Sequence, residues 1–179
     1  DISFVPAWGQ NRMRGMLDSR PDWCLSRQRA WGLPIPAFVQ SDGSVLLIHD
    51  TVRAIAKIFE EHGSDAWFAQ PPEVLLVHWE NPDGIDLSSL EKMHDIFDVW
   101  FESGTSWHAV MKARSQGYPI DLYLEGSDQH RGWFQLSMLP ALATTGVSPF
   151  KTVLTHGFMV AKDGKKMSKS GGNALSVEE

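Results

Sequence analysis

The sequence is poor in cysteine, in basic charge and in long apolar runs, and each shortage excludes a class of protein. Cys24 is the single cysteine among 179 residues, so a disulfide framework and a zinc site of paired cysteines are both excluded. No apolar run approaches the roughly 20 residues that span a bilayer. The first residues lack the basic start and apolar core of a signal peptide. We therefore expect a cytoplasmic protein that does not insert into membranes.

Basic residues are outnumbered, and they are unevenly distributed. The net charge is −6, and residues 42–102 carry 13 acidic but only three basic groups. In contrast, residues 1–32 hold five arginines against three acids, and residues 151–170 hold five lysines against one acid. We expect the two ends to attract anionic ligands and the middle to repel them.

The composition, with 42% apolar residues and eight tryptophans, is that of a folded globular protein. The chain lacks an initiator methionine and opens within a pattern, which suggests a piece of a longer protein. We divide it into residues 1–40, an acidic insertion over residues 41–95, and an α/β segment over residues 96–179. No internal repeat is present.

Before the α/β segment, the pattern predicts few regular elements. Prolines within residues 33–39 favour an edge strand, and the turn at residues 40–44 predicts a hairpin through residues 45–48. Residues 51–62 are predicted to form an amphipathic helix that ends at Gly63. Its apolar stripe is formed by Val52, Ile55, Ala56 and Phe59. Residues 64–95 are expected to have little regular structure.

The α/β segment contains strand-like runs at residues 96–101, 121–125 and 152–155. A helix is predicted over residues 129–145, kinked at Pro140 and ended by Gly146. Strand, helix and strand at this spacing predict a parallel βαβ unit. A capping-box pattern at residues 176–179 predicts the start of a further helix.

Ligands of parallel sheets gather at the carboxyl ends of the strands, where this chain has several polar residues. Gly126 allows a ligand to approach closely, and Asp128 and Gln129 offer groups for ribose hydroxyls or an amine. Alternatively, Ser127 or Asp128 caps the following helix, and both interpretations can hold. His156 and Gly157, at the end of the next strand, suit adenine or phosphate.

Two tryptophans near these strand ends have two interpretations. Trp100 and Trp133 could wall a pocket, although tryptophans more often belong to a core. The remaining histidines have neither partner cysteines nor metal-ligand spacing, so we predict no metal site.

The segment from Lys162 to Asn173 packs four lysines, two serines and three glycines into twelve residues. This composition suits a phosphate clamp, because lysine supplies a compact charge and glycine exposes backbone N–H groups. A solvated basic loop is the alternative. A P-loop is excluded, because Met159 stands where its first glycine must be and Lys166 follows Gly164-Lys165.

Five segments together resemble, in order and spacing, the isoleucyl-tRNA synthetase family of class I aminoacyl-tRNA synthetases. They are Trp23–Gly32, Asp98–Gly104, Leu124–Phe134, Leu154–Phe158 and the KMSKS sequence Lys166–Ser170. The resemblance implies a Rossmann-type parallel sheet, of which this chain is the second half, with residues 1–40 following an editing domain. It also implies isoleucine, ATP with Mg and tRNA(Ile) as substrates of a monomeric full-length enzyme, with no zinc bound in this segment.

The resemblance further implies roles for individual residues. Lys166 and Lys169 would stabilise charge on the departing pyrophosphate. The ATP and adenylate site would contain Gly126, Asp128, Gln129, His156, Gly157, Phe158, Met159 and Ser168. The amino-acid site would contain Trp100, Glu125 and Trp133.

One family signature is absent, since no histidine starts a His-hydrophobic-Gly-His tetrapeptide. That tetrapeptide supplies half of the ATP site in the family, so we expect this chain alone to be inactive. Two alternatives are a non-enzymatic nucleotide- or tRNA-acceptor-binding module with this fold, and a parent enzyme that activates valine or leucine.

Overall fold

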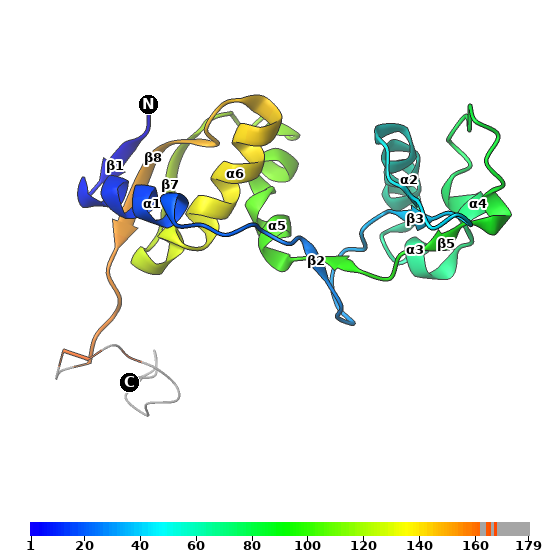
Figure 1. The fold of residues 1–179 in the computed structure, drawn as a ribbon. Helices are drawn as coiled ribbons and strands as arrows, with labels where there is room; N and C mark the ends of the chain where they lie inside the picture. Colours follow the sequence, from blue (N-terminus) through cyan, green and yellow to red (C-terminus); the bar gives the residue numbers. More distant parts are fainter. Residues whose placement is uncertain (162–163, 166, 168–179) are drawn as a thin grey trace, which may run out of the picture. The chain divides into compact units, whose positions relative to one another are not determined.

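The computed structural model describes residues 1–161, 164, 165 and 167 (Figure 1). The chain divides into two compact units. Unit 1 combines Asp1–Trp23 with Trp100–Glu179, and unit 2 is Cys24–Val99. The expected KMSKS residues Lys166, Ser168 and Lys169, and the capping box at residues 176–179, lie outside the described residues.

Unit 1 is built on a parallel sheet in the order β1-β8-β7. Its strands are β1 (Ser3–Val5), β7 (Ile120–Gly126) and β8 (Phe150–His156). Both β1 and β7 run parallel to β8. The predicted βαβ unit is confirmed, because α6 (Trp133–Thr145) connects β7 to β8. Strand β1 was not predicted, because its three residues are too few for a periodic pattern.

The two faces of this sheet differ. Tyr123 and Val153 are buried, whereas Leu122 and Leu124 are 47% and 51% exposed. Because side chains alternate along a strand, one face packs in the core and the opposite face is open in the described part of the chain. The core of unit 1 consists of Met13, Tyr123, Phe134, Met138, Phe150 and Val153. Met13 comes from α1 (Trp8–Asp18), which packs with α6 (Figure 1).

The helix predicted from Gln129 begins four residues later than expected. Residues Ser127–His130 form the 3-10 helix η3, and α6 starts at Trp133. Gly132 separates the two with a non-helical φ of −107° and ψ of −122°. The helix continues through Pro140, and Gly146 ends it with a left-handed φ of 69°, as predicted.

The strand predicted over residues 96–101 is mostly wrong. Only Ile96–Phe97 form a strand, β6, which pairs antiparallel with β2 (Ser26–Arg27) rather than joining the parallel sheet. Val99–Gly104 form helix α5 instead. Gly104 lies so close to α6 that a Cβ there would overlap the carbonyl oxygen of Leu136. This tertiary packing overrides the strand propensity of the Val-Trp-Phe sequence. A π-helical turn, η2 (Trp107–Lys112), follows.

In unit 2, a small antiparallel sheet has the order β4-β3-β5. The predicted hairpin is confirmed as β3 (Phe38–Val39) with β4 (Val45–Leu46). The expected edge position of residues 33–39 is wrong, because β5 (Glu91–Lys92) pairs with the other side of β3. Pro34 and Pro36 precede β3, so the pairing residues keep their N–H groups.

Helix α2 (His49–His62) confirms the predicted amphipathic helix and its end before Gly63. Its buried face is rotated from the predicted stripe, since Val52 and Ala56 are exposed while Thr51, Ala54 and Ile58 are buried. Thr51 can be buried because its hydroxyl donates to the carbonyl of Ile48 at 2.9 Å.

Residues 64–95 hold more structure than predicted. They contain α3 (Ala66–Ala69), α4 (Pro72–Leu75) and the 3-10 helix η1 (Leu87–Ser89). Trp67, Leu75, Leu76 and Leu90 of this segment are buried with Phe38 and Ile55 in one cluster. Residues 64–95 therefore supply much of the core of unit 2.

Candidate functional site

The carboxyl ends of β7 and β8 bring four of the expected nucleotide-site residues together. Gly126 and His156 are register partners in the parallel ladder. A Cβ on Gly126 would lie 2.8 Å from Oδ1 of Asp128, 3.5 Å from the ring of Phe158 and 3.7 Å from the ring of His156. A larger residue here would force the Asp128 carboxylate, which folds back over the backbone, to move. These residues form one cluster, as their positions at neighbouring strand ends predict.

Glu125 points to the other side of the sheet. It shares the face of Tyr123, because side chains two apart in a strand point the same way, and its register partner is Thr155. Glu125 is exposed, and its Oε2 accepts a hydrogen bond of 3.3 Å from the N–H of Gly126. The carboxylate thus lies on the α6 side of the strand ends, and the His156 imidazole lies on the open side.

Three expected site residues meet around Gly132. The backbone N–H of Trp133 donates to Oε1 of Gln129 at 2.8 Å. A Cβ on Gly132 would overlap the same amide oxygen and would lie 3.2 Å from the ring of Trp100. The expected cap from Ser127 or Asp128 is not formed. Gln129 instead satisfies the first N–H of α6. A side chain at position 132 would force that amide or the Trp100 ring to shift.

Trp133 has structural contacts on one side of its ring. Its indole stacks on the Tyr123 ring, with centroids 4.1 Å apart and planes 9° from parallel. Its N–H donates to the carbonyl of Ser103 at 3.0 Å. The side chain is half-buried, and burial raises the pKa of the Tyr123 hydroxyl beneath it. Trp133 therefore packs against the core and is also partly exposed.

The residues that lead into the KMSKS sequence fold back on Met159 and Ala161, which follow β8. The N–H of Gly164 donates to Ala161 O, and that of Ala161 donates to Lys165 O, both at 2.8 Å. The N–H of Met167 donates to Met159 O at 3.2 Å. Gly157, Phe158 and Met159 are all exposed along this stretch. The described part of the lysine segment thus starts at the same end of the sheet as Gly126.

His130 and Gly132 are functional candidates to which the sequence assigned no role. His130 is completely buried at the end of η3, and burial lowers the pKa of its imidazole. Gly132 follows two polar residues and precedes a tryptophan, and in the sequence it looks like an ordinary loop glycine. From the sequence alone, neither residue can be recognised as part of the site, because its role depends on which residues lie against it in the fold.

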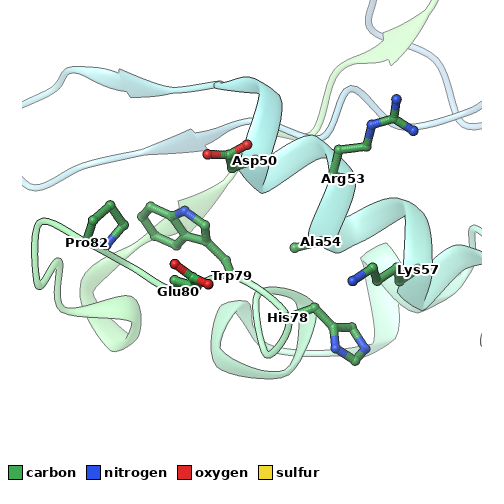
Figure 2. A pocket seen from close by; sticks show the side chains of 8 residues that line it. All are labelled: Asp50, Arg53, Ala54, Lys57, His78, Trp79, Glu80 and Pro82. Carbon is green, nitrogen blue, oxygen red and sulfur yellow. The ribbon is translucent and has the colours of Figure 1, made fainter.

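A separate pocket lies in unit 2 and contains none of the expected site residues. Its volume is about 330 Å³. Figure 2 shows Asp50, Trp79, Glu80 and Pro82 toward one end and Lys57 and His78 toward the other, with Arg53 pointing away. Charges of both signs line this pocket. Among the described residues, no group of three or more His, Cys, Asp or Glu side chains could hold a metal ion. In the same residues, no helix is long and apolar enough to cross a membrane.

Comparisons with known proteins identify the family of this chain. A family model described as tRNA synthetases class I (I, L, M and V) matches residues 1–179. An isoleucine–tRNA ligase of a Nitratiruptor species is 51% identical over 97% of this chain, and one of Sulfurimonas denitrificans is 50% identical over 98%. The chain spans 19% of the length of each of these relatives.

A solved structure extends the comparison to the fold. It is a LeuRS of Agrobacterium radiobacter in a ternary complex with tRNA and LeuAMS. It matches 88% of this chain with a TM-score of 0.57 and 18% identity, and the match covers 22% of that protein. The likeness supports the α/β class, with its parallel sheet, that the sequence predicted.

Proposed function

Because the chain belongs to the class I tRNA synthetase family, we propose that the protein that carries it is an isoleucine–tRNA ligase. It activates isoleucine with ATP and Mg, forms isoleucyl-adenylate and transfers the acyl group to tRNA(Ile). The names of the relatives at about 50% identity support isoleucine over the other amino acids of the family.

The parallel pairing of Gly126 with His156 carries this proposal. It brings the Asp128–Gln129 turn beside the exposed segment from His156 to Met159. We propose that Asp128 and Gln129 hold the ribose hydroxyls, and that His156, Gly157 and Phe158 line the adenine. Gly126 allows the nucleotide to approach the strand end closely. Met159 extends the same surface toward the lysine segment.

Isoleucine would bind on the α6 side of the same strand ends. Glu125 supplies a carboxylate for the amino group, and Trp133 supplies an apolar ring edge on the same face. Trp100 reaches the neighbouring surface through its contact at Gly132. The adenylate would therefore pass over the ends of β7 and β8, with its amino-acid and adenine parts on opposite faces of the sheet.

Lys166 and Lys169, with Ser168 between them, would contact the phosphates. Their proposed role is to stabilise charge that develops on the departing pyrophosphate, which requires positioned cations rather than a covalent nucleophile. The backbone hydrogen bond from Met167 to Met159 supports it, because it ties the motif to the adenine side of the site.

ATP–pyrophosphate exchange tests the proposal in the complete polypeptide. Exchange should depend on isoleucine and should be at least about 100-fold less efficient with valine, given what one methylene group contributes to discrimination. Equal exchange with valine or leucine would reassign the substrate. Nucleotide binding without exchange for any of the three amino acids would support the non-enzymatic binding module instead. The isolated chain should show no exchange, and robust activity from it would contradict the need for the tetrapeptide that it lacks.

A further inference from the structure

His130 closes the turn that contains Asp128 and Gln129. Its Nδ1 lies 3.0 Å from the carbonyl oxygen of Ser127. A carbonyl oxygen can only accept a hydrogen bond, so Nδ1 must carry the proton. In a neutral imidazole the proton on Nδ1 leaves Nε2 as a bare acceptor. The structure therefore selects one tautomer of this histidine.

The other ring nitrogen faces the first helix of unit 1. Nε2 of His130 is buried and has no hydrogen-bond partner. A Cβ on Gly9 of α1 would lie only 3.2 Å from it. The ring also packs 5.7 Å from the Trp8 ring and edge-on, at 5.3 Å, to the Phe134 ring. The imidazole thus packs between α1 and α6, and its one polar contact is with the carbonyl of Ser127 in the turn.

The turn is held by backbone hydrogen bonds and by one side-chain contact near each end. Backbone hydrogen bonds run from Arg131 N to Asp128 O and from Gly132 N to Gln129 O, each at 3.1 Å. On the far side, Gln129 is held by the N–H of Trp133. At the Ser127 end, the side-chain contact is the bond from His130 Nδ1 to the Ser127 carbonyl. A shift of the imidazole would therefore move the Asp128 carboxylate relative to β8.

We propose that His130 is a positioning residue, whose Nδ1–H tautomer, held against α1, fixes the turn that presents Asp128 and Gln129 to the nucleotide. The inference rests on the proposed function for the identity of the ligand. His130 itself does not contact the nucleotide, because its side chain is completely buried. It acts through the Ser127 carbonyl.

Two substitutions separate this role from simple packing. H130N puts an amide nitrogen where Nδ1 was and can still donate to Ser127 O. H130Q puts its amide group near the Nε2 position, against Gly9, and loses the bond to Ser127. In the complete polypeptide, H130Q should raise the KM for ATP by about tenfold, the effect of one hydrogen bond of ordinary strength. H130N should recover most of that loss, and the KM for isoleucine should change less than about threefold in both variants.

The outcomes are decisive in either direction. Equal losses in H130N and H130Q, or equal changes in the KM values for ATP and isoleucine, would overturn the positioning role and indicate packing alone. If H130Q does not fold, the tautomer of the wild-type protein still decides. Nitrogen-15 NMR of the histidine side chains should show His130 protonated at Nδ1 and bare at Nε2, and a proton on Nε2 would overturn the inference.

Failure of the proposed function would look different. If the wild-type polypeptide showed no isoleucine-dependent exchange, the ligand assignment would fail. The positioning role would then be decided by the tautomer and by amide hydrogen exchange of residues 126–130. Amide hydrogen exchange of these residues should accelerate in H130Q but not in H130N. Acceleration in neither variant would overturn the positioning role.

Discussion

The side-chain carbonyl of Gln129 accepts a hydrogen bond of 2.8 Å from the backbone N–H of Trp133. This bond orients the rest of the amide, so that its NH2 group faces the Asp128 carboxylate, with Nε2 and Oδ2 3.4 Å apart. One side chain thus presents donors and its neighbour presents acceptors. These are the donors and acceptors that we propose to hold the ribose hydroxyls, each of which donates and accepts.

Substitutions of Gln129 should separate its two functions. Q129E keeps an oxygen for the N–H of Trp133 but loses the amide donors and adds a negative charge beside Asp128. Q129A loses both. We expect Q129A to lower the free energy of unfolding by about 1 kcal/mol, as loss of a helix cap does, and Q129E to change it less. Both should raise the KM for ATP in the complete polypeptide. Urea denaturation and exchange kinetics provide the two measurements, and an unchanged KM in Q129E would contradict the donor role.

Gly104 should be intolerant of any side chain. A Cβ there would overlap the carbonyl oxygen of Leu136, which is backbone and cannot rotate away. We expect G104A to destabilise the chain by about 3 kcal/mol or more, because α5 must separate from α6. G15A is the matched control, since Gly15 lies within α1 with no atom within 4 Å of the added Cβ. It should stabilise by about 0.5–1 kcal/mol through helix propensity. Similar melting temperatures for the two variants would disprove the close contact.

The sequence predicted the parts of the fold that depend on local pattern and missed those that depend on tertiary approach. The strands ending at Gly126 and His156 were predictable because each is an apolar run followed by polar residues. Residues 96–101 were predicted to form a strand because their β-branched and aromatic residues favour one. Only the contact of Gly104 with α6 shows why Val99–Gly104 form a helix.

In the candidate site, too, the features set by local pattern were predicted and those set by tertiary contacts were missed. Alternation and strand order were enough to predict that Gly126 and His156 lie together. The sequence could not show that Gln129 caps α6, because glutamine is a poor local signal for a cap and the bond spans Gly132. It also could not show that the histidine next to Gln129 is buried against a helix more than a hundred residues away in sequence.

Stability should decrease in mildly acidic solution through His130. Burial lowers the pKa of its imidazole, and the positive charge of Arg12 adds to this, while the bond to Ser127 O opposes it. The other groups against the ring, from Trp8, Gly9 and Phe134, are uncharged. The unfolded chain, with a histidine pKa near 6.5, therefore takes up the proton first as the pH falls. The stability that is present above about pH 6.5 is lost as the pH falls toward the lowered folded pKa.

Urea midpoints between about pH 8 and pH 5 measure this effect. The wild-type chain and H130N share all the other histidines, so their difference isolates His130. H130N should show the weaker dependence on pH. A steeper dependence in H130N would mean that the folded chain holds the proton more tightly than the unfolded chain does.

The ion pair between Arg27 and Asp98 should stabilise unit 2. Their atoms Nη2 and Oδ2 are 2.7 Å apart, and the Asp98 side chain is only 8% exposed. Removing Arg27 leaves the buried Asp98 carboxylate without the positive charge beside it. R27A should therefore lower the free energy of unfolding by about 2 kcal/mol. This is less than for a fully buried pair, because the Arg27 side chain is 35% exposed. D121A is the control, since its pair with Lys151 is exposed on both sides and should contribute less than about 0.5 kcal/mol. Equal effects in denaturant titrations would show that burial of Asp98 is irrelevant.

Lys169 lies outside the described residues, and its role is tested by kinetics. An interaction that strengthens as charge moves onto the pyrophosphate lowers the barrier without tightening the ground state. K169A in the complete polypeptide should therefore lower the rate of isoleucine activation by about 100-fold or more, while the affinity for isoleucine changes little. Single-turnover adenylate formation and equilibrium isoleucine binding separate the two quantities. K151A is a suitable control, because Lys151 is exposed near the start of β8, at the opposite end from His156. Equal losses of rate and affinity in K169A would mean that the lysine contributes uniform binding, and its assignment to the transition state would be wrong.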